Sequence, residues 1–251
     1  MRYKRGKKPA SGGVALAFAT IFDPSKLPPV PMEFGHYAQI GTQWGMLAND
    51  KVGDCVICDA AHQTMLWSRI AERPLVYFNN GAVLADYSAV AGFDPRDPDN
   101  TDNGTDMSQM ASYRRNIGVQ DAYGGRHKVD AYVSLDAGNA DELAAAAYFF
   151  GAASVGVWLP DAAEDQFDNH QPWTVQPGPR PEDGHCITCV GRKANGNFVF
   201  VTWGGLAEVT PNFIAAYMDE GICFLSSEML IKNASVEGFD VARLQEFLAA
   251  L

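Results

Sequence analysis

The two halves of this 251-residue chain favour different kinds of secondary structure. Before about residue 135 the apolar residues mostly recur at helical spacing, whereas after it β-prone runs such as SVGVWL (154–159) become frequent. A run of helices followed by a run of strands is typical of α+β proteins. We therefore expect an α+β fold with an extended, basic and Pro-rich arm at 1–35, a helical lobe at 36–135 and a β-rich lobe at 136–251.

A cysteine opens the strongest predicted helix of the first half. In VGDCVICDAAHQTML the apolar residues recur at intervals of four from Ile57 to Met65, which predicts a helix over 54–71. Asp54 stands where a side chain can cap the first turn. Cys55 would then lie at the positive end of the helix dipole, which lowers the pKa of a thiol and favours the nucleophilic thiolate.

A reactive thiol also needs a base, and His185 is the best placed of the five histidines. His62 is two turns along the same helix as Cys55 and is too far away along the axis. His185 opens a predicted β-hairpin with strands at 187–190 and 198–203. Because a histidine at a strand start can be held rigidly against a helix end, the sequence predicts a Cys55–His185 pair.

Other roles for the cysteines compete with this one. Free cysteines are among the most buried residues, so core packing is the alternative for Cys55. The pairs Cys55-x-x-Cys58 and Cys186-x-x-Cys189 have the ligand types of a zinc site, but residues three apart on a strand face opposite sides. We expect no metal and no cofactor.

The segment at 93–107 is rich in aspartate and has no β-prone or helical periodicity. No acid stands at the spacing of the bidentate ligand that closes a calcium loop. We therefore expect a solvated loop here rather than a cation site.

The candidate pair belongs to a longer series of positions: Asn49, Gly53-Asp54-Cys55, Gly184-His185 and Val201-Thr202-Trp203-Gly204. This series resembles the motifs of papain-like cysteine peptidases, in which a glutamine stands six residues before the cysteine and an Asn-Ser-Trp-Gly motif follows the histidine. The resemblance implies a papain-like fold in which Cys55 attacks and His185 is base and then acid. It also implies that Asn49 donates to the oxyanion and that Trp203 shields the pair from water.

Two positions depart from the family pattern. Asn49 replaces glutamine, and its amide is one methylene shorter, which puts its reach to the oxyanion in doubt. Val201 replaces the asparagine that orients the histidine; Asp183, Thr202 or the DQFDNHQ segment (165–171) could take over that task. Loss of an orienting residue alone can leave substantial catalysis, so an active enzyme and a vestigial one both remain open.

The chain also resembles uncharacterised proteins encoded by phages and prophages, over segments such as WGMLANDKVGDC and VTWGGLAEVTPNFIAAYMDE. That resemblance implies a phage-encoded amide-bond hydrolase whose substrate is a protein or a peptidoglycan crosspeptide. The alternative is a non-catalytic structural virion component, a capsid or tail decoration on a papain-like scaffold. Either function implies a location in the virion or the host cytoplasm.

The first thirteen residues, MRYKRGKKPASGG, carry five basic side chains and no acid, although the whole chain has a net charge of −11. The acidic body is unsuited to nucleic acid. The apolar run that follows is short, so we expect neither a signal peptide nor a membrane segment. The basic arm is expected to be either a solvated tail or an anchor onto another virion protein.

Overall fold

The structure is a computed structural model that describes residues 3–22, 27–231 and 237. Helices dominate the first half and strands the second, so the expected α+β class is confirmed. The helices are α1 (Phe18–Ile21), α2 (Cys55–Ile70), α3 (Asn80–Ala91), α4 (Pro98–Thr101), α5 (Met107–Asn116), α6 (Ala140–Phe149), α7 (Ala162–Asp168) and α8 (Pro211–Tyr217), with 3-10 turns η2 (Tyr37–Gln39) and η3 (Ser227–Met229).

A seven-stranded sheet forms the other part of the fold. Its strands run in the order β4-β9-β5-β6-β7-β8, β1 pairs with β6, and all pairs are antiparallel. The strands are β1 (Phe34–Gly35), β4 (Ala131–Leu135), β5 (Ala153–Trp158), β6 (Gly184–Arg192), β7 (Phe198–Thr202), β8 (Gly205–Val209) and β9 (Met218–Leu225), while β2 (Val119–Gln120) and β3 (Arg126–His127) form a separate ribbon.

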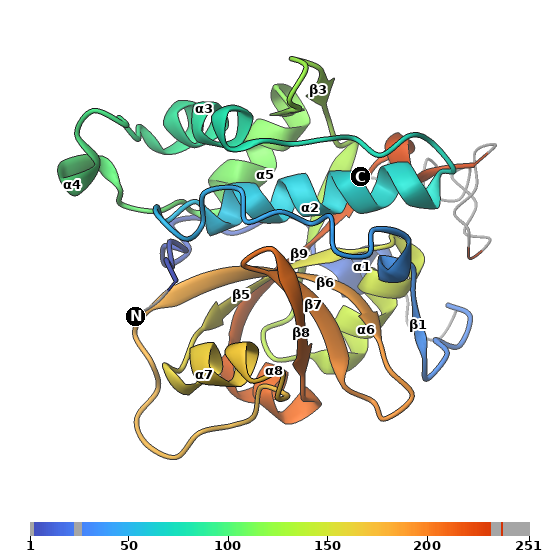
Figure 1. Cartoon of the computed structure of the whole chain (residues 1–251). Coiled ribbons are helices and arrows are strands. Elements are labelled where there is room, and N and C mark those ends of the chain that lie inside the picture. The colour runs from blue at the N-terminus through green and yellow to red at the C-terminus, as the bar shows by residue number, and fades with distance from the viewer. Residues whose placement is uncertain (1–2, 23–26, 232–236, 238–251) are drawn as a thin grey trace.

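Helix α2 lies between the helices α3 and α5 and the sheet. Figure 1 shows α2 with α3 and α5 on one side and the strands on the other. All its residues except Arg69 are buried, as expected for a helix enclosed on every side. Its packing against β6 sets the position of its first residue, Cys55, relative to the sheet.

Polar contacts fix α2 against the sheet. The buried Asp59 carboxylate accepts hydrogen bonds from Ser154 of β5 and from Thr188 Oγ1 of β6, the latter at 2.6 Å. Gln63, one turn further, donates to Asp59 at 3.0 Å and to Ser154 at 2.6 Å. Because a buried polar group without a partner is costly, this network favours one placement of the helix on the sheet.

The predicted hairpin is confirmed, with a longer first strand than expected: β6 runs from Gly184 to Arg192 and pairs with β7. Strand β4 lies just inside the predicted helical lobe, yet it pairs with β9 of the sheet. The boundary near residue 135 stays a prediction. No helix in the described part of the chain is long and apolar enough to cross a membrane.

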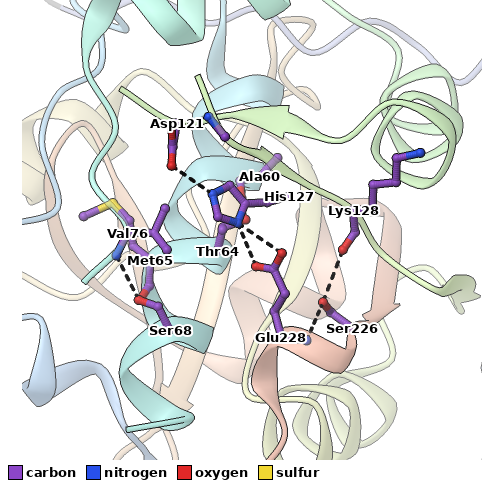
Figure 2. A network of polar contacts seen from close by, with 11 residues as sticks. Ala60, Thr64, Met65, Ser68, Val76, Asp121, His127, Lys128, Ser226 and Glu228 are labelled. Atoms are coloured by element: carbon purple, nitrogen blue, oxygen red, sulfur yellow. Dashed lines mark hydrogen bonds and ion pairs between the residues drawn. The ribbon is translucent and has the colours of Figure 1, made fainter. Parts of the chain in front are cut away.

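The β2–β3 ribbon is joined to the end of the sheet by a histidine. Figure 2 shows the His127 ring between Asp121 and Glu228. Nδ1 lies 2.9 Å from Glu228 Oε2, and Nε2 lies 3.3 Å from Asp121 Oδ2. Since Glu228 lies in η3, directly after β9, this contact connects segments about a hundred residues apart.

Candidate active site

Cys55 is the first residue of α2, as the sequence predicts, and it is fully buried. Its Sγ accepts a hydrogen bond from the backbone N–H of Cys186, with N and S 3.4 Å apart. Cys186 directly follows His185 on β6. The structure therefore brings the predicted nucleophile to the strand position beside the predicted base.

The turn before Cys55 is held in a way that the sequence did not reveal. Asp54 occupies the N-cap position, but its side chain makes no capping hydrogen bond, so the predicted cap is wrong. Instead, Asp54 Oδ1 accepts from Asn49 Nδ2 at 3.1 Å. The Gly53 N–H donates to Asp102 Oδ1 at 2.8 Å. Asp102 follows α4, so the aspartate-rich segment contains a short helix and braces the turn rather than forming only a solvated loop.

The Asn49 amide is occupied within this turn. Besides Asp54, its Nδ2 group donates to the carbonyl oxygen of Val52 at 3.2 Å. An amide nitrogen carries two hydrogens, and both are used here. The oxyanion role of Asn49 therefore stays a prediction that requires this pairing to rearrange, whereas bracing the loop before Cys55 is what the amide does in the structure.

His185 is the second residue of β6 and is completely buried. Its Nε2 lies 2.8 Å from Thr202 Oγ1, and its Nδ1 makes no hydrogen bond. The ring also stacks on Trp203, with centroids 4.9 Å apart. One nitrogen is thus held in place by a hydroxyl, while the other is free to exchange a proton with a nearby group.

Thr202 supplies the contact that Val201 cannot make. Of the three replacements considered from the sequence, only Thr202 bonds to the His185 ring. Asp183 instead lies 3.7 Å from Arg5, and Asp168 of the DQFDNHQ segment accepts from the Tyr3 hydroxyl at 2.7 Å.

Residues 3–8, which we call the inserted segment, lie across Cys55 and β6. Gly6 lies beside Cys55, whose thiol pKa the Gly6 N–H acts to lower, and the Gly6 carbonyl accepts from the Thr105 N–H at 2.7 Å. Lys7 donates its N–H to the Gly184 carbonyl at 3.0 Å. The Lys4 carbonyl accepts from Trp203 Nε1 at 3.3 Å. The sequence interpretation missed this segment, because backbone contacts of this kind leave no periodic pattern.

The inserted segment packs against its own chain and is partly buried there. Lys7 is only 4% exposed, so a solvated tail is the wrong description for this part of the arm. Tyr3 stacks on Trp203 with centroids 4.5 Å apart. The space left beside Cys55 and Trp203 is about 10 Å³, roughly enough for one water molecule. The predicted anchoring of the arm on a virion protein stays a prediction.

Burial sets the protonation states of the pair. It raises the pKa of Cys55 to about 12, although the N–H groups of Cys186 and Gly6 act in the opposite direction. Burial, and with it the positive charge of Arg5, lowers the pKa of His185 to about 3. At neutral pH the site therefore holds a thiol and a neutral imidazole rather than a thiolate and an imidazolium.

Cys58, His62 and Cys186 also line the small cavity beside Cys55. Nε2 of His62 lies 3.2 Å from the Gly45 carbonyl, and burial lowers its pKa to about 4. The five cysteines are free and buried. Within the described residues no cluster of three or more histidine, cysteine, aspartate or glutamate side chains could hold a metal ion.

Comparisons with known proteins identify the architecture. No protein-family model matches the sequence, and no curated protein matches it either. Among solved structures, xylellain, a cysteine protease from Xylella fastidiosa, is similar over 90% of this chain and 97% of its own, with a TM-score of 0.57 at 14% identity. Procathepsin L 3 from the Tenebrio molitor larval midgut matches over 89% of this chain and 76% of its own, with a TM-score of 0.62 at 12% identity.

A procathepsin B from Trypanosoma congolense, proCathepsin B S9, also matches, over 88% of this chain and 86% of its own. Its TM-score is 0.62 and its identity 11%. At such low identities the likeness establishes the fold and not the activity. This chain has the fold of the papain-like cysteine proteases.

Proposed function

We propose that the protein is a papain-like thiol hydrolase that cleaves an amide bond of a peptide, with Cys55 as nucleophile and His185 as base. The observation that carries this proposal is the contact between Cys55 Sγ and the backbone next to His185, at the junction of α2 and β6. The stacked Trp203 and the bonded Thr202 hydroxyl support the assignment, because both orient the imidazole.

The chemistry needs only these groups and water. His185 takes the thiol proton as Cys55 Sγ bonds to the carbonyl carbon, and it returns that proton to the amine as the C–N bond breaks. Water, deprotonated by His185, then attacks the thioester; the S–C bond breaks and the thiol regains its proton. The amide is thus hydrolysed to an acid and an amine, with the thiol regenerated.

The inserted segment keeps the site in a resting state. It buries Cys55, which disfavours the thiolate, and the positive charge of Arg5 disfavours the imidazolium that a thiolate would need as its partner. The Gly6 carbonyl oxygen is bonded to the Thr105 N–H at 2.7 Å and not to a donor beside the thiol, so the segment is not aligned for attack. Displacement of residues 3–8 is therefore the activating step in this proposal.

A phage origin, with action in the virion or host cytoplasm on a protein or a peptidoglycan crosspeptide, extends the proposal and rests on the sequence resemblance alone. The second candidate is a structural virion component with a vestigial site. The observations that favour it are the high pKa of the buried Cys55 thiol and the occupied Asn49 amide.

Alkylation of each cysteine by iodoacetamide, followed by mass spectrometry across a pH series, separates the two candidates. The chain is compared with an Arg5→Glu/Lys7→Glu variant, in which like charges expel the inserted segment, and with the same variant carrying His185→Ala. We expect Cys55 to be inert in the native chain, to react below pH 7 in the opened variant, and to slow again without His185. An opened Cys55 that titrates like an ordinary thiol would exclude the hydrolase. Cys223, buried in β9, is the internal control because expulsion of the segment leaves it covered.

A further inference from the structure

We infer that the groove occupied by the inserted segment recognises a cationic peptide strand with a glycine between two basic residues. We infer further that such strands are the substrate class when they bind in the chain direction opposite to that of the inserted segment. This second step rests on the proposed function. The inference is drawn from two acidic pockets, from the close approach at the glycine and from the direction of the backbone.

The first pocket holds the Arg5 side chain, which is 3% exposed. Its guanidinium donates to Glu164 at 3.1 Å and to the Leu159 carbonyl at 2.8 Å. Asp161 lies 3.1 Å away and Asp183 3.7 Å away. Three carboxylates and a carbonyl around one buried group select a planar cation with several donors, which is the character of arginine.

The second pocket holds the Lys7 ammonium, whose side chain is not exposed at all. Nζ donates to Asp219 Oδ2 at 2.7 Å, lies 3.0 Å from Glu220 Oε1 and sits 4.8 Å from the centre of the Trp158 ring. Burial opposes the charge, but the two carboxylates outweigh it and raise the pKa of Lys7. A neutral side chain here would leave two partly buried acids without a partner, so the pocket selects a cation.

Between the pockets only glycine fits. A Cβ on Gly6 would stand 1.8 Å from the Gly53 carbonyl oxygen, which belongs to the turn before Cys55. Gly184 approaches the segment from the other side, since a Cβ there would stand 2.3 Å from the Lys7 carbonyl oxygen. The groove is therefore narrow at the thiol and charged on both sides of it.

The direction in which a peptide backbone runs along the groove decides whether it blocks the site, as the inserted segment does, or can be cleaved as a substrate. Lys7 pairs with Thr105 in parallel register, and this directs the Gly6 carbonyl to the Thr105 N–H and not to Cys55. A strand of opposite direction exchanges the places of its N–H and C=O groups along the groove. Its glycine carbonyl would then face the thiol, with the lysine pocket on the N-terminal side of the glycine and the arginine pocket on the C-terminal side. The expected substrate pattern is Lys-Gly-Arg, cleaved after glycine.

Recognition is tested first without thiol chemistry, in the full chain carrying Cys55→Ala. A cleavage sequence for a specific protease is inserted between Gly12 and Gly13, which are exposed and have open space around them. After folding, the linker is cut, and release of the N-terminal fragment is followed by gel filtration and mass spectrometry. Three segments are compared: the native one, Arg5→Glu/Lys7→Glu, and the control Lys4→Glu/Lys8→Glu.

The control makes the same change in charge at two side chains for which the described residues show no ion pair. We expect the Arg5→Glu/Lys7→Glu fragment to leave about tenfold faster than native or more, and the control to stay within about threefold. Equal release of all three would overturn the inference. If the charge-reversed chain fails to fold, the release rate of the native fragment is measured at rising salt concentration instead. We expect faster release at high salt, because ion pairs weaken as ionic strength rises. A release rate that does not change with salt would also overturn the inference.

The opened chain then receives fluorescein-labelled peptides containing Lys-Gly-Arg, Glu-Gly-Glu or Lys-Val-Arg. Binding of the first alone, measured by anisotropy on the Cys55→Ala chain, supports the inference, and equal binding of all three contradicts it. Cleavage after glycine is read by mass spectrometry on the chain with Cys55 intact. If the Lys-Gly-Arg peptide binds selectively but is not cleaved, the inferred recognition is supported and the proposed hydrolase activity is contradicted. Failure of the inference and failure of the proposed function are therefore distinguishable.

Discussion

Thr202 Oγ1 lies 2.8 Å from Nε2 of His185, and both residues are buried. Thr202 follows Val201, where the papain-like motif has an asparagine, so the orienting contact has moved by one residue along β7. A hydroxyl both donates and accepts, and it therefore holds the ring in position for either tautomer.

Replacing Thr202 by valine leaves both nitrogens of a buried imidazole without a hydrogen bond. We expect Thr202→Val to lower the free energy of unfolding by about 1–3 kcal/mol in urea titrations. In the opened variant it should also slow Cys55 alkylation below pH 7. Thr202→Ser keeps the hydroxyl and should restore both. A serine variant as impaired as the valine variant would assign the effect to packing.

Gly6 and Gly12 form a matched pair for testing the close contact at Cys55. Gly6→Ala places a methyl group against the Gly53 carbonyl, whereas the same change at Gly12 meets open space. We expect Gly6→Ala to cost about 1–3 kcal/mol of stability, or to expel the segment and expose Cys55 to iodoacetamide. Gly12→Ala should lie within about 0.5 kcal/mol of the native chain. Equal behaviour of the two variants would argue against insertion in solution.

The His127 contacts make stability depend on pH. Burial opposes protonation, but Glu228 and Asp121 outweigh it and raise the pKa of His127 above 6.5. A raised folded-state pKa means that the contribution is complete below about pH 6.5 and is lost as the pH rises through the folded value. His127→Gln should therefore destabilise the protein more at pH 5.5 than at pH 8.5 in urea unfolding. A larger effect at pH 8.5 would contradict the ion pairs drawn in Figure 2.

Asp59 tests the network that fixes α2 on the sheet. Asp59→Ala leaves Thr188, Ser154 and Gln63 without their shared acceptor, so we expect a loss of about 3–5 kcal/mol in urea unfolding. Asp50→Ala, at an exposed position close in sequence, is the control and should change stability by less than about 0.5 kcal/mol. A loss at Asp59 no larger than at Asp50 would mean that packing alone holds the helix.

Local patterns predicted the elements that carry the site. The helix of Cys55 and the hairpin opened by His185 follow from spacing and residue type, and the structure contains both. They were accessible because each depends on neighbours within a few residues.

Contacts between distant segments could not be predicted in this way. Asp54 looked like a cap, but Asn49 is a competing partner that the loop brings close only after folding. The inserted segment looked like a tail because five cations without periodicity are typical of one. The signal that could have indicated it is complementarity: a Lys-Arg-Gly-Lys run in front of an acidic body, with a glycine where the backbone must pass closely.

A short stretch of chain tethers the inserted segment to the sheet. Leu16 is attached to β4, because its carbonyl accepts the Ser134 N–H at 2.8 Å. The stretch between Lys8 and Leu16 includes the Gly12-Gly13 pair, which has open space around it. A segment on such a short linker has an effective concentration of about millimolar at its groove, and dilution of the protein does not change that concentration. A competing strand must therefore exceed that concentration, or bind more tightly than the segment does. The tether thus sets a threshold: dilute peptides that bind no more tightly than the segment leave the groove closed, whereas a local accumulation of cationic chains opens it.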